Sequence, residues 1–344
     1  MALIRSRSRP RAAPRVSSLN VVLLHDETED LRGREGEEAH VGVWEAILPI
    51  QESMARLGHR TRTVSLGMGI DKLVRALVKD RPDVVFHLAE TAFGDTMGEA
   101  RVTSLLDLLN LPHTSAPPDA LLLCRDKLKA KAVLGEYGVF TPPHAISTDG
   151  TLPENLPLPP WISKPTLEDG SIGVTADAVT SDPLRLRRRV GSLYRKLRQP
   201  ILIESYIAGR EINVGVVGDE VLPLAEIDFS RLPEGAARIV GYESKWKYDT
   251  VYFKCTQTLC PAPLPAALRD RIVQVGRTVL GALNVRGYTR IDLRLDRHNR
   301  IYVLEVNPNP DLSPIAGMAK MAVTAGWGFD GLITRILDFA RSSR

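Results

Sequence analysis

The first third of the chain alternates short hydrophobic runs with longer segments of mixed polarity. Three runs have the length and composition of buried strands: 19–25, 61–66 and 82–88. Two segments between them carry apolar residues at helical spacing: 41–58 and 70–79. This strand-then-helix order predicts an open α/β domain with a parallel sheet over residues 19–116.

Ligands of such a domain gather beyond the carboxyl ends of its strands. Four titratable residues follow the third hydrophobic run: His87, Glu90, Asp95 and Glu99. Acids at these positions can line a ligand site, or they can only cap the helix that begins near Gly98. The sequence leaves both interpretations open.

A second, smaller α/β unit is predicted over residues 117–206, and it opens with a helix at 120–137. The lysines of this helix are expected mostly on a solvated face: Lys127, Lys129 and Lys131. Further along, the loop 164–174 reads K-P-T-L-E-D-G-S-I-G-V. A glycine-bearing loop led by a lysine can wrap a polyphosphate with its backbone N–H groups. A flexible surface hairpin is the alternative.

A strand, a glycine turn and a second strand span 200–219 and place Glu204 and Glu211 at the two ends of the turn. Adenine and ribose both need hydrogen-bond acceptors, so this pair has a plausible joint use in nucleotide binding. A salt bridge is the ordinary role of either acid alone. Three further elements are predicted in the last unit, 207–344: a strand at 221–229 and helices at 264–283 and 331–340.

Two alternating runs between residues 288 and 308 flank a polar loop, which predicts a β-hairpin. If Asp296 faces Ile301, the antiparallel register places Asp292 opposite Glu305 and Arg290 opposite Asn307. These four side chains then share one face. The other face is apolar and is expected to be buried: Ile291, Leu293, Leu295, Tyr302, Leu304 and Val306.

Two carboxylates that oppose each other on neighbouring strands, with Cβ atoms about 5 Å apart, repel and destabilise the pair. Something positive is therefore expected between Asp292 and Glu305. A hard divalent cation such as Mg²⁺, bound by carboxylate and amide oxygens and sharing a phosphate, resolves the conflict.

The charge balance limits the kind of partner. The chain has 344 residues, 45 basic against 41 acidic, but five arginines precede the first acid. Without that tail, 1–18, which is predicted to be disordered, 40 basic residues face 41 acidic ones, so no nucleic-acid surface is expected. No run is long enough for a membrane span. The odd count of three cysteines favours a reducing cytoplasm.

The motifs taken in order resemble one superfamily. A lysine helix is followed by the loop K-P-x-x-x-x-G-S-I-G, then E-S-Y-I-x-G-x-E, K-W, R-I-D and L-E-V-N-P. This series resembles the ATP-grasp superfamily, and within it the D-alanine:D-alanine ligases, over residues 20–336. The resemblance implies an α/β (α+β) ATP-grasp fold, in which two subdomains sandwich ATP behind an N-terminal α/β domain.

Site residues carry over from the family pattern. Residues implied to bind ATP are Lys127, Lys164, Ser171, Glu204, Tyr206, Ile207, Glu211 and Lys245. Ligands implied for two Mg²⁺ ions, or Mn²⁺ in their place, are Asp292, Glu305 and Asn307. Arg290 matches the arginine that stabilises the oxyanion, and Ser171 and Lys245 join it as catalytic residues.

The mechanism implied is the phosphorylation of a carboxylate by ATP to an acyl phosphate, which an amine then attacks to give an amide. The expected function is therefore an ATP-dependent carboxylate-amine ligase for small, amino-acid-like substrates. Two alternatives stay open: a D-alanine:D-alanine ligase of cell-wall synthesis, and a nucleotide-binding protein without ligase turnover. Relatives are commonly dimers through the first domain, so a homodimer is expected by analogy.

The sequence departs from the family where the substrate is held. Gly170 replaces a serine of the phosphate loop, Trp246 replaces a tyrosine, and Asp311 and Ala316 replace a glycine and a carboxylate-binding serine. An aspartate there disfavours an incoming carboxylate and favours a cationic or amine group. Candidate substrate-binding residues are His25, Glu90, Trp246, Asn309 and Asp311.

Overall fold

The computed structural model describes residues 18–26, 37–92, 95 and 97–342, without the side chains of residues 37–45. The predicted N-terminal tail lies outside these ranges, apart from Ser18. Within the described residues, no helix combines the length and the hydrophobicity that crossing a membrane requires.

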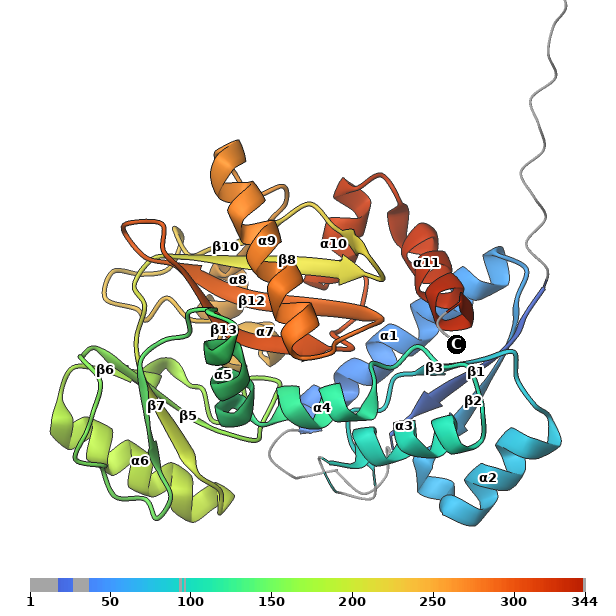
Figure 1. Cartoon of the computed structure of the whole chain (residues 1–344), viewed down its shortest axis with the longest axis horizontal. Coiled ribbons are helices and arrows are strands. Elements are labelled where there is room, and N and C mark those ends of the chain that lie inside the picture. The colour runs from blue at the N-terminus through green and yellow to red at the C-terminus, as the bar shows by residue number, and fades with distance from the viewer. Residues whose placement is uncertain (1–17, 27–36, 93–94, 96, 343–344) are drawn as a thin grey trace, which may run out of the picture.

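A three-stranded parallel sheet forms the N-terminal part of the molecule, as the alternating pattern predicts (Figure 1). Its strands lie in the order β2-β1-β3, with the bounds β1 Asn20–His25, β2 Arg60–Ser65 and β3 Val84–His87. Three helices accompany it: α1 Glu37–Arg56, α2 Ile70–Lys79 and α3 Gly98–Leu108. Val22 and Leu24 of β1 pack with α2 and α3, while Val21 and Leu23 pack with α1 and the C-terminal helix α11, Gly328–Ser342. The strand is therefore buried on both faces.

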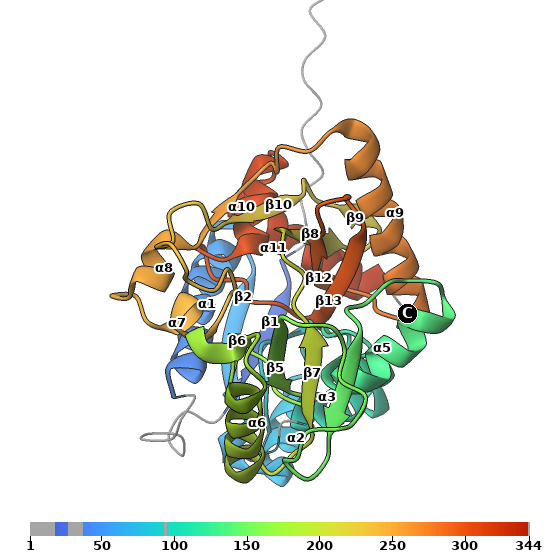
Figure 2. The same cartoon turned by 90° about the vertical axis from the view of Figure 1, so that its left-hand side faces the viewer.

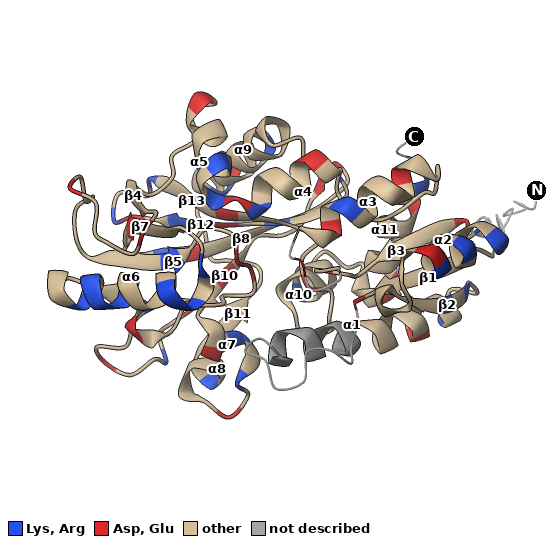
Figure 3. Ribbon diagram, turned by 90° about the horizontal axis from the view of Figure 1, so that it is seen from below, with Lys and Arg blue, Asp and Glu red and all other residues tan. Residues whose placement is uncertain are grey.

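The second sheet is antiparallel and has the order β4-β7-β5-β6. Its strands are β4 His144–Ser147, β5 Trp161–Pro165, β6 Val179–Thr180 and β7 Ile201–Ser205. Helix α6, Pro183–Leu197, buries Leu186 and Val190 against it. Lysines and arginines lie along this helix (Figure 3), which is consistent with one apolar and one solvated face.

The third sheet is antiparallel, with the order β11-β10-β8-β12-β13 and β9 paired to β8. Its strands are β8 Arg210–Val217, β9 Glu220–Val221, β10 Ala225–Asp228, β11 Gln257–Leu259, β12 Tyr288–Leu295 and β13 Ile301–Pro308. Helix α9, Ala266–Ala282, covers one face through Ile272 and Val279. Helix α10, Gly317–Thr324, packs on part of the other face, where a Cβ at Gly215 would lie 2.7 Å from Met321. Glycine at 215 lets this helix approach closely.

Two elements that were predicted to be continuous are each divided in the structure. The predicted helix at 120–137 is two helices, α4 Pro118–Arg125 and α5 Lys127–Glu136, because Asp126 is extended and its carboxylate accepts from the N–H groups of Leu128 and Lys129 at 3.1 Å. The predicted strand at 221–229 is interrupted between β9 and β10, where Pro223 lies.

The three sheets fall one in each of the predicted segments 19–116, 117–206 and 207–344. Core residues of α4 and α5 nevertheless pack with the third sheet. The domain boundaries therefore stay a prediction. Figures 1 and 2 agree that β5 and β7 of the second sheet lie below β12 and β13 of the third. Two short helices, α7 Tyr242–Trp246 and α8 Val251–Cys255, lie beside this arrangement.

Candidate active site

A cavity of about 570 Å³ lies between the second and third sheets. Its walls include parts of α3, α4, α5, β5, the loop after β5, the β7–β8 turn, α7, β12, β13 and α10. Every site residue predicted from the sequence lines this cavity except His25. His25 is buried at the end of β1, where its Nδ1 lies 2.8 Å from the carbonyl oxygen of Asp26.

The β12–β13 hairpin brings the predicted acids face to face. Asp292 pairs with Glu305 and Arg290 pairs with Asn307, so this part of the predicted register is confirmed. Nearer the turn, Leu295 rather than Asp296 faces Ile301, and the prediction there is wrong by one residue. A bulge between these regions restores the expected pairing at Asp292.

The bulge also changes which side chains are buried. The extra residue is Leu304, which lines the cavity and does not lie on the buried face where the pattern placed it. Tyr302 pairs with Arg294 and is only partly buried. The other four members of the predicted apolar face are in the core: Ile291, Leu293, Leu295 and Val306.

Asp292 accepts four hydrogen bonds. Arg290 donates to both carboxylate oxygens, from Nε to Oδ1 at 2.7 Å and from Nη2 to Oδ2 at 2.9 Å. The amide nitrogen of Asn213 donates to Oδ1 at 2.7 Å and that of Asn307 to Oδ2 at 3.0 Å. A carboxylate offers about four lone-pair sites, so Asp292 is saturated by its neighbours.

Glu305 is surrounded by cations without being hydrogen-bonded closely to them. Burial alone raises the pKa of Glu305, but Lys127, Lys164, Lys245 and Arg290 outweigh it and bring the pKa to about 2. Lys127 is the lysine of α5 that approaches it, with 3.9 Å between Nζ and Oε2. The positive surroundings expected between the two acids are therefore present, supplied by side chains.

Glu204 lies between two lysines. Its carboxylate is 1% exposed and lies 2.5 Å from Lys131 Nζ and 2.9 Å from Lys164 Nζ. Burial opposes ionisation of Glu204, but the two lysines lower its pKa to about 2. The solvated face expected for the helix lysines is wrong for Lys131 and Lys127, which are both buried. Their spacing of four residues, which puts them on one helix face, is the signal that could have paired them.

Glu211 is paired with an arginine that sequence reasoning missed. Arg294 donates to Glu211 Oε2 from Nη2 at 2.8 Å and to the carbonyl oxygen of Ile207 from Nη1 at 2.9 Å. Its guanidinium lies 4.8 Å from the centre of the Tyr206 ring. Burial raises the pKa of Glu211, and Arg294 opposes the rise. The roles expected for Glu204 and Glu211 in holding adenine and ribose stay predictions.

The phosphate-loop candidate is held against α7. The indole N–H of Trp246 donates to the carbonyl oxygen of Gly170 at 2.9 Å, and the hydroxyl of Ser171 donates to that of Val240 at 2.9 Å. Gly170 and Ser171 both have left-handed φ values, 62° and 63°. Two departures from the family pattern, Gly170 and Trp246, thus contact each other. Lys245, also on α7, lines the same wall.

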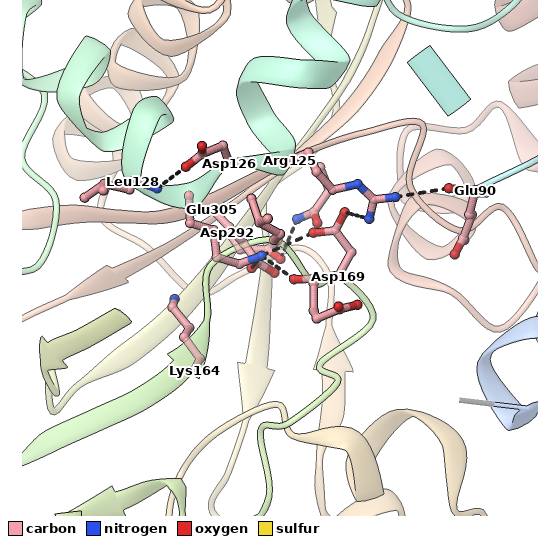
Figure 4. A network of polar contacts seen from close by, with 12 residues as sticks. Glu90, Arg125, Asp126, Leu128, Lys164, Asp169, Asp292 and Glu305 are labelled. Carbon is pink, nitrogen blue, oxygen red and sulfur yellow. Dashed lines mark hydrogen bonds and ion pairs between the residues drawn. The ribbon is translucent and has the colours of Figure 1, made fainter. Parts of the chain in front are cut away.

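Three acids line one part of the cavity, which we call its acidic end: Glu90, Glu99 and Asp311. Figure 4 shows Arg125 between Glu90 and Asp169. Arg125 donates to Asp169 Oδ2 at 2.7 Å and to the backbone carbonyl of Glu90 at 3.1 Å. Asn309 donates to Glu99 Oε1 at 2.7 Å, so Glu99 faces the cavity as well as opening α3. Arg125 and Asp169 had no motif that marked them.

The donor set fits a hard divalent cation in part. Glu305 supplies an anionic carboxylate, and Asn307 supplies an amide oxygen because its nitrogen is donated to Asp292. Asp292 can become a ligand only when one of its four donors withdraws. Among the described residues, no group of three or more His, Cys, Asp or Glu is placed to hold a metal ion.

Comparison with known proteins agrees with this arrangement. The solved structure of D-alanine–D-alanine ligase from Bacillus anthracis complexed with ATP superposes with a TM-score of 0.71 at 18% identity, covering 95% of this chain and 98% of that one. The fold is therefore the predicted ATP-grasp fold.

Sequence relatives identify the family. The model described as "D-ala D-ala ligase C-terminus" matches residues 145–338. D-alanine–D-alanine ligase of Caulobacter vibrioides is 31% identical over 303 residues, 85% of this chain and 87% of that protein. The uncharacterized protein y4sG of Sinorhizobium fredii is 34% identical over 265 residues, 75% of this chain and 74% of that protein. The chain belongs to the D-alanine–D-alanine ligase family.

Proposed function

We propose that this protein is an ATP-dependent ligase that joins a carboxylate to an amine. The observation that carries the proposal is the convergence, in one cavity, of the hairpin residues Arg290, Glu305 and Asn307 with Lys127 and Lys164 from the opposing elements. Such a set places positive charge where a transferring phosphoryl group needs it and leaves little covalent chemistry to the protein.

In the first step a substrate carboxylate oxygen attacks the γ-phosphorus of ATP, and ADP leaves. Lys127, Lys164 and Lys245 neutralise the phosphate charge, while the Ser171 loop closes over it. In the second step the ammonium of the amine substrate releases a proton to solvent, its nitrogen attacks the acyl carbon, and the C–O bond to phosphate breaks so that inorganic phosphate departs. Arg290 stabilises the oxyanion that forms between these events.

Mg²⁺ is part of the proposal. Glu305 and Asn307 would hold it, joined by Asp292 once Arg290 turns from Asp292 toward the substrate. When bound, the metal supplies charge neutralisation to the phosphates. Two ions, as in the family pattern, and replacement by Mn²⁺ are included in the proposal.

The proposal includes a cellular location and an oligomeric state. The three cysteines, all in the described part of the chain, are free thiols, which suits a cytoplasmic enzyme. A homodimer through the N-terminal domain is proposed by analogy with relatives. D-alanine:D-alanine ligase itself is the second candidate, favoured by the names of the relatives and opposed by Asp311 and Ala316.

Release of ADP tests the proposal. The full-length protein is incubated with ATP, Mg²⁺ and a panel of D- and L-amino acids and simple amines, and products are identified by mass spectrometry. Glu305→Gln is expected to lower ADP release at least about 100-fold, the usual effect of removing one preorganised stabilising group. Glu220→Gln, on the exposed strand β9, is the matched control and keeps the wild-type rate.

Each other outcome has a defined meaning. Dipeptide formation from D-alanine alone would favour the second candidate. No ADP release by the wild type with any substrate of the panel, or a measured role that survives Glu305→Ala, would favour a nucleotide-binding protein without turnover.

A further inference from the structure

A small recess opens from the acidic end of the cavity. It has a volume of about 40 Å³ and shares six lining residues with the main cavity. A water-sized group needs only about 10–15 Å³ of such space, so the recess can hold an ammonium-sized group. Three carboxyl groups line it, from Glu90 after β3, Glu99 in α3 and Asp311 after β13.

The described residues that line the recess include no lysine or arginine. Arg125, the nearby cation of the main cavity, directs its guanidinium to the Asp169 carboxylate and to the backbone carbonyl of Glu90. Asp311 accepts from two neutral donors, the N–H and hydroxyl of Ser313, at 2.7 and 3.0 Å. Lys320 lines the main cavity from α10 but not the recess.

Among the described residues, Arg125 opposes the rise in the pKa of Glu90 and Glu99 without cancelling it, and Arg290 acts on Asp311 from the main cavity. Glu90 is exposed to solvent, but desolvation by the surrounding protein atoms, with Asp26 and Asp311 as neighbours, raises its pKa to about 7 although Arg125 opposes the rise. Burial raises the pKa of Glu99 to about 8, in spite of the hydrogen bond from Asn309. Carboxyl groups in this state gain most when a cation enters beside them.

The remaining walls also suit a cation. His87 lines the recess, is 1% exposed, and has no hydrogen-bond partner at either ring nitrogen among the residues that the structure describes. Burial lowers the pKa of His87 to about 3, so its ring is a neutral group that can accept a hydrogen bond. Trp246 and Tyr288 add aromatic rings, whose faces attract cations.

We propose that the recess binds the cationic group of the amine substrate, and that this substrate carries no free carboxylate beside that group. The substrate class is therefore a small cationic amine, such as an amino-acid amide or a diamine, rather than a free amino acid. The inference rests on the proposed ligase function, because only a ligase would use the bound amine as a substrate. The binding preference itself can be measured without turnover.

Calorimetry with three matched probes tests the proposal. Full-length protein, loaded with Mg²⁺ and a non-hydrolysable ATP analogue at pH 7, is titrated with D-alaninamide, D-alanine and propionamide. D-alaninamide has the ammonium without the carboxylate, D-alanine has both, and propionamide has neither. The Kd of D-alaninamide is expected to be at least about tenfold below that of D-alanine, because acids that ionise when the ammonium enters then repel a carboxylate beside it. Propionamide is expected to bind more weakly than D-alaninamide by a similar factor.

Two variants and a control locate the preference. Glu99→Gln and Asp311→Asn are each expected to reduce the ratio between D-alanine and D-alaninamide to about threefold or less. Asp107→Asn, on α3 and paired with His113 away from the cavity, is expected to keep the wild-type ratio. Circular dichroism and thermal melting verify that each variant is folded.

The proposal is overturned if D-alanine binds as tightly as D-alaninamide, if propionamide matches D-alaninamide, or if none of the three binds. It is also overturned if both variants keep the wild-type ratio. ADP release is read separately, so a binding preference without ADP release would contradict the ligase function and leave the recess assignment standing.

Discussion

Two pairs of acids lie in the same cavity and have opposite electrostatics. Asp292 and Glu305 oppose each other on β12 and β13, and four cationic side chains bring the pKa of Glu305 to about 2. Glu90 and Glu99 lie at the other end, and their pKa values are raised to about 7 and about 8. Glu305 is anionic before any ligand arrives, whereas Glu99 holds a proton near pH 7 that an entering cation displaces.

The difference separates the tasks of the two ends. A compensated pair adds little net charge, so the lysines and Arg290 around it remain able to receive an anion such as a polyphosphate. An uncompensated pair attracts a cation and discriminates against a carboxylate. The end with Asp292 and Glu305, which we propose holds ATP, thus keeps the hairpin residues of the family pattern, while the end with Glu90 and Glu99, which we propose holds the substrate, includes two departures from it, Trp246 and Asp311.

Removing the cation that holds Asp292 gives the largest expected change. In Arg290→Gln, Asp292 retains only the amides of Asn213 and Asn307, and loss of one partner of a buried pair costs about 3–5 kcal/mol. We expect the free energy of unfolding, measured by urea denaturation, to fall by about 3 kcal/mol, because these amides compensate in part.

Arg210→Gln is the matched control, since Arg210 also pairs with a carboxylate, that of Glu226 at 2.6 Å, but is one-third exposed. This pair is expected to contribute less than about 1 kcal/mol. If the free energy of unfolding fell no more in Arg290→Gln than in Arg210→Gln, the hairpin acids would not depend on Arg290. The contrast between the two ends of the cavity would then be wrong.

The hairpin shows what sequence can and cannot supply. Alternation and loop length placed Asp292 opposite Glu305, because a strand has a fixed period of two. The bulge at Leu304 was not visible, since an extra residue in one strand leaves the local pattern of apolar residues nearly unchanged. The prediction reached the correct pair through a wrong register at the turn, and it misplaced Tyr302 and Leu304.

The ion pairs between distant segments were the other feature that the sequence did not predict. The order of strands, loops and helices, together with the family motifs, gave the candidate site residues. All of these candidates except His25 line the cavity. The same signals gave no reason to bury Lys131 or to join Arg294 to Glu211, because partners from distant segments are set by tertiary packing. Asp126 did carry a local signal, as an acid is a favoured N-cap, and it could have divided the helix at 120–137.

The pH dependence of stability separates the two acidic pairs. Native Glu99 and Glu90 keep their protons above the ordinary value of 4.5, so between about pH 5 and pH 8 the unfolded chain binds fewer protons and the free energy of unfolding falls as pH rises. Glu305 acts in the opposite sense, and its contribution is lost as pH falls from about 4.5 toward about 2.

Urea denaturation of wild type and Glu99→Gln at pH 5, 6, 7 and 8 measures how much Glu99 contributes to the pH dependence of the free energy of unfolding. The wild type is expected to lose about 2 kcal/mol relative to the variant across this range, less than the full pKa shift implies because the cavity admits solvent. Parallel curves would show that Glu99 is compensated after all, and the two ends would then be alike.

The smallest expected effect concerns Trp246, which lines both the main cavity and the recess. Trp246→Phe keeps an aromatic ring but removes the 2.9 Å hydrogen bond to the carbonyl oxygen of Gly170. One such bond is worth about 0.5–1.5 kcal/mol, so the Kd of an ATP analogue is expected to rise about 2–10-fold. Trp161→Phe removes a similar bond, to Pro157 at 2.7 Å outside the cavity, and is expected to leave this Kd unchanged.

The same variant decides whether the two ends act independently. If the ring alone matters to the recess, Trp246→Phe weakens binding of the ATP analogue and leaves the affinity for D-alaninamide within about twofold, because a phenyl ring also attracts cations. If both affinities fall together, the hydrogen bond to Gly170 couples closure of the phosphate loop to occupation of the recess. Unchanged affinity for the ATP analogue would show that the loop does not depend on Trp246, and the contact between the two departures from the family would be structural only.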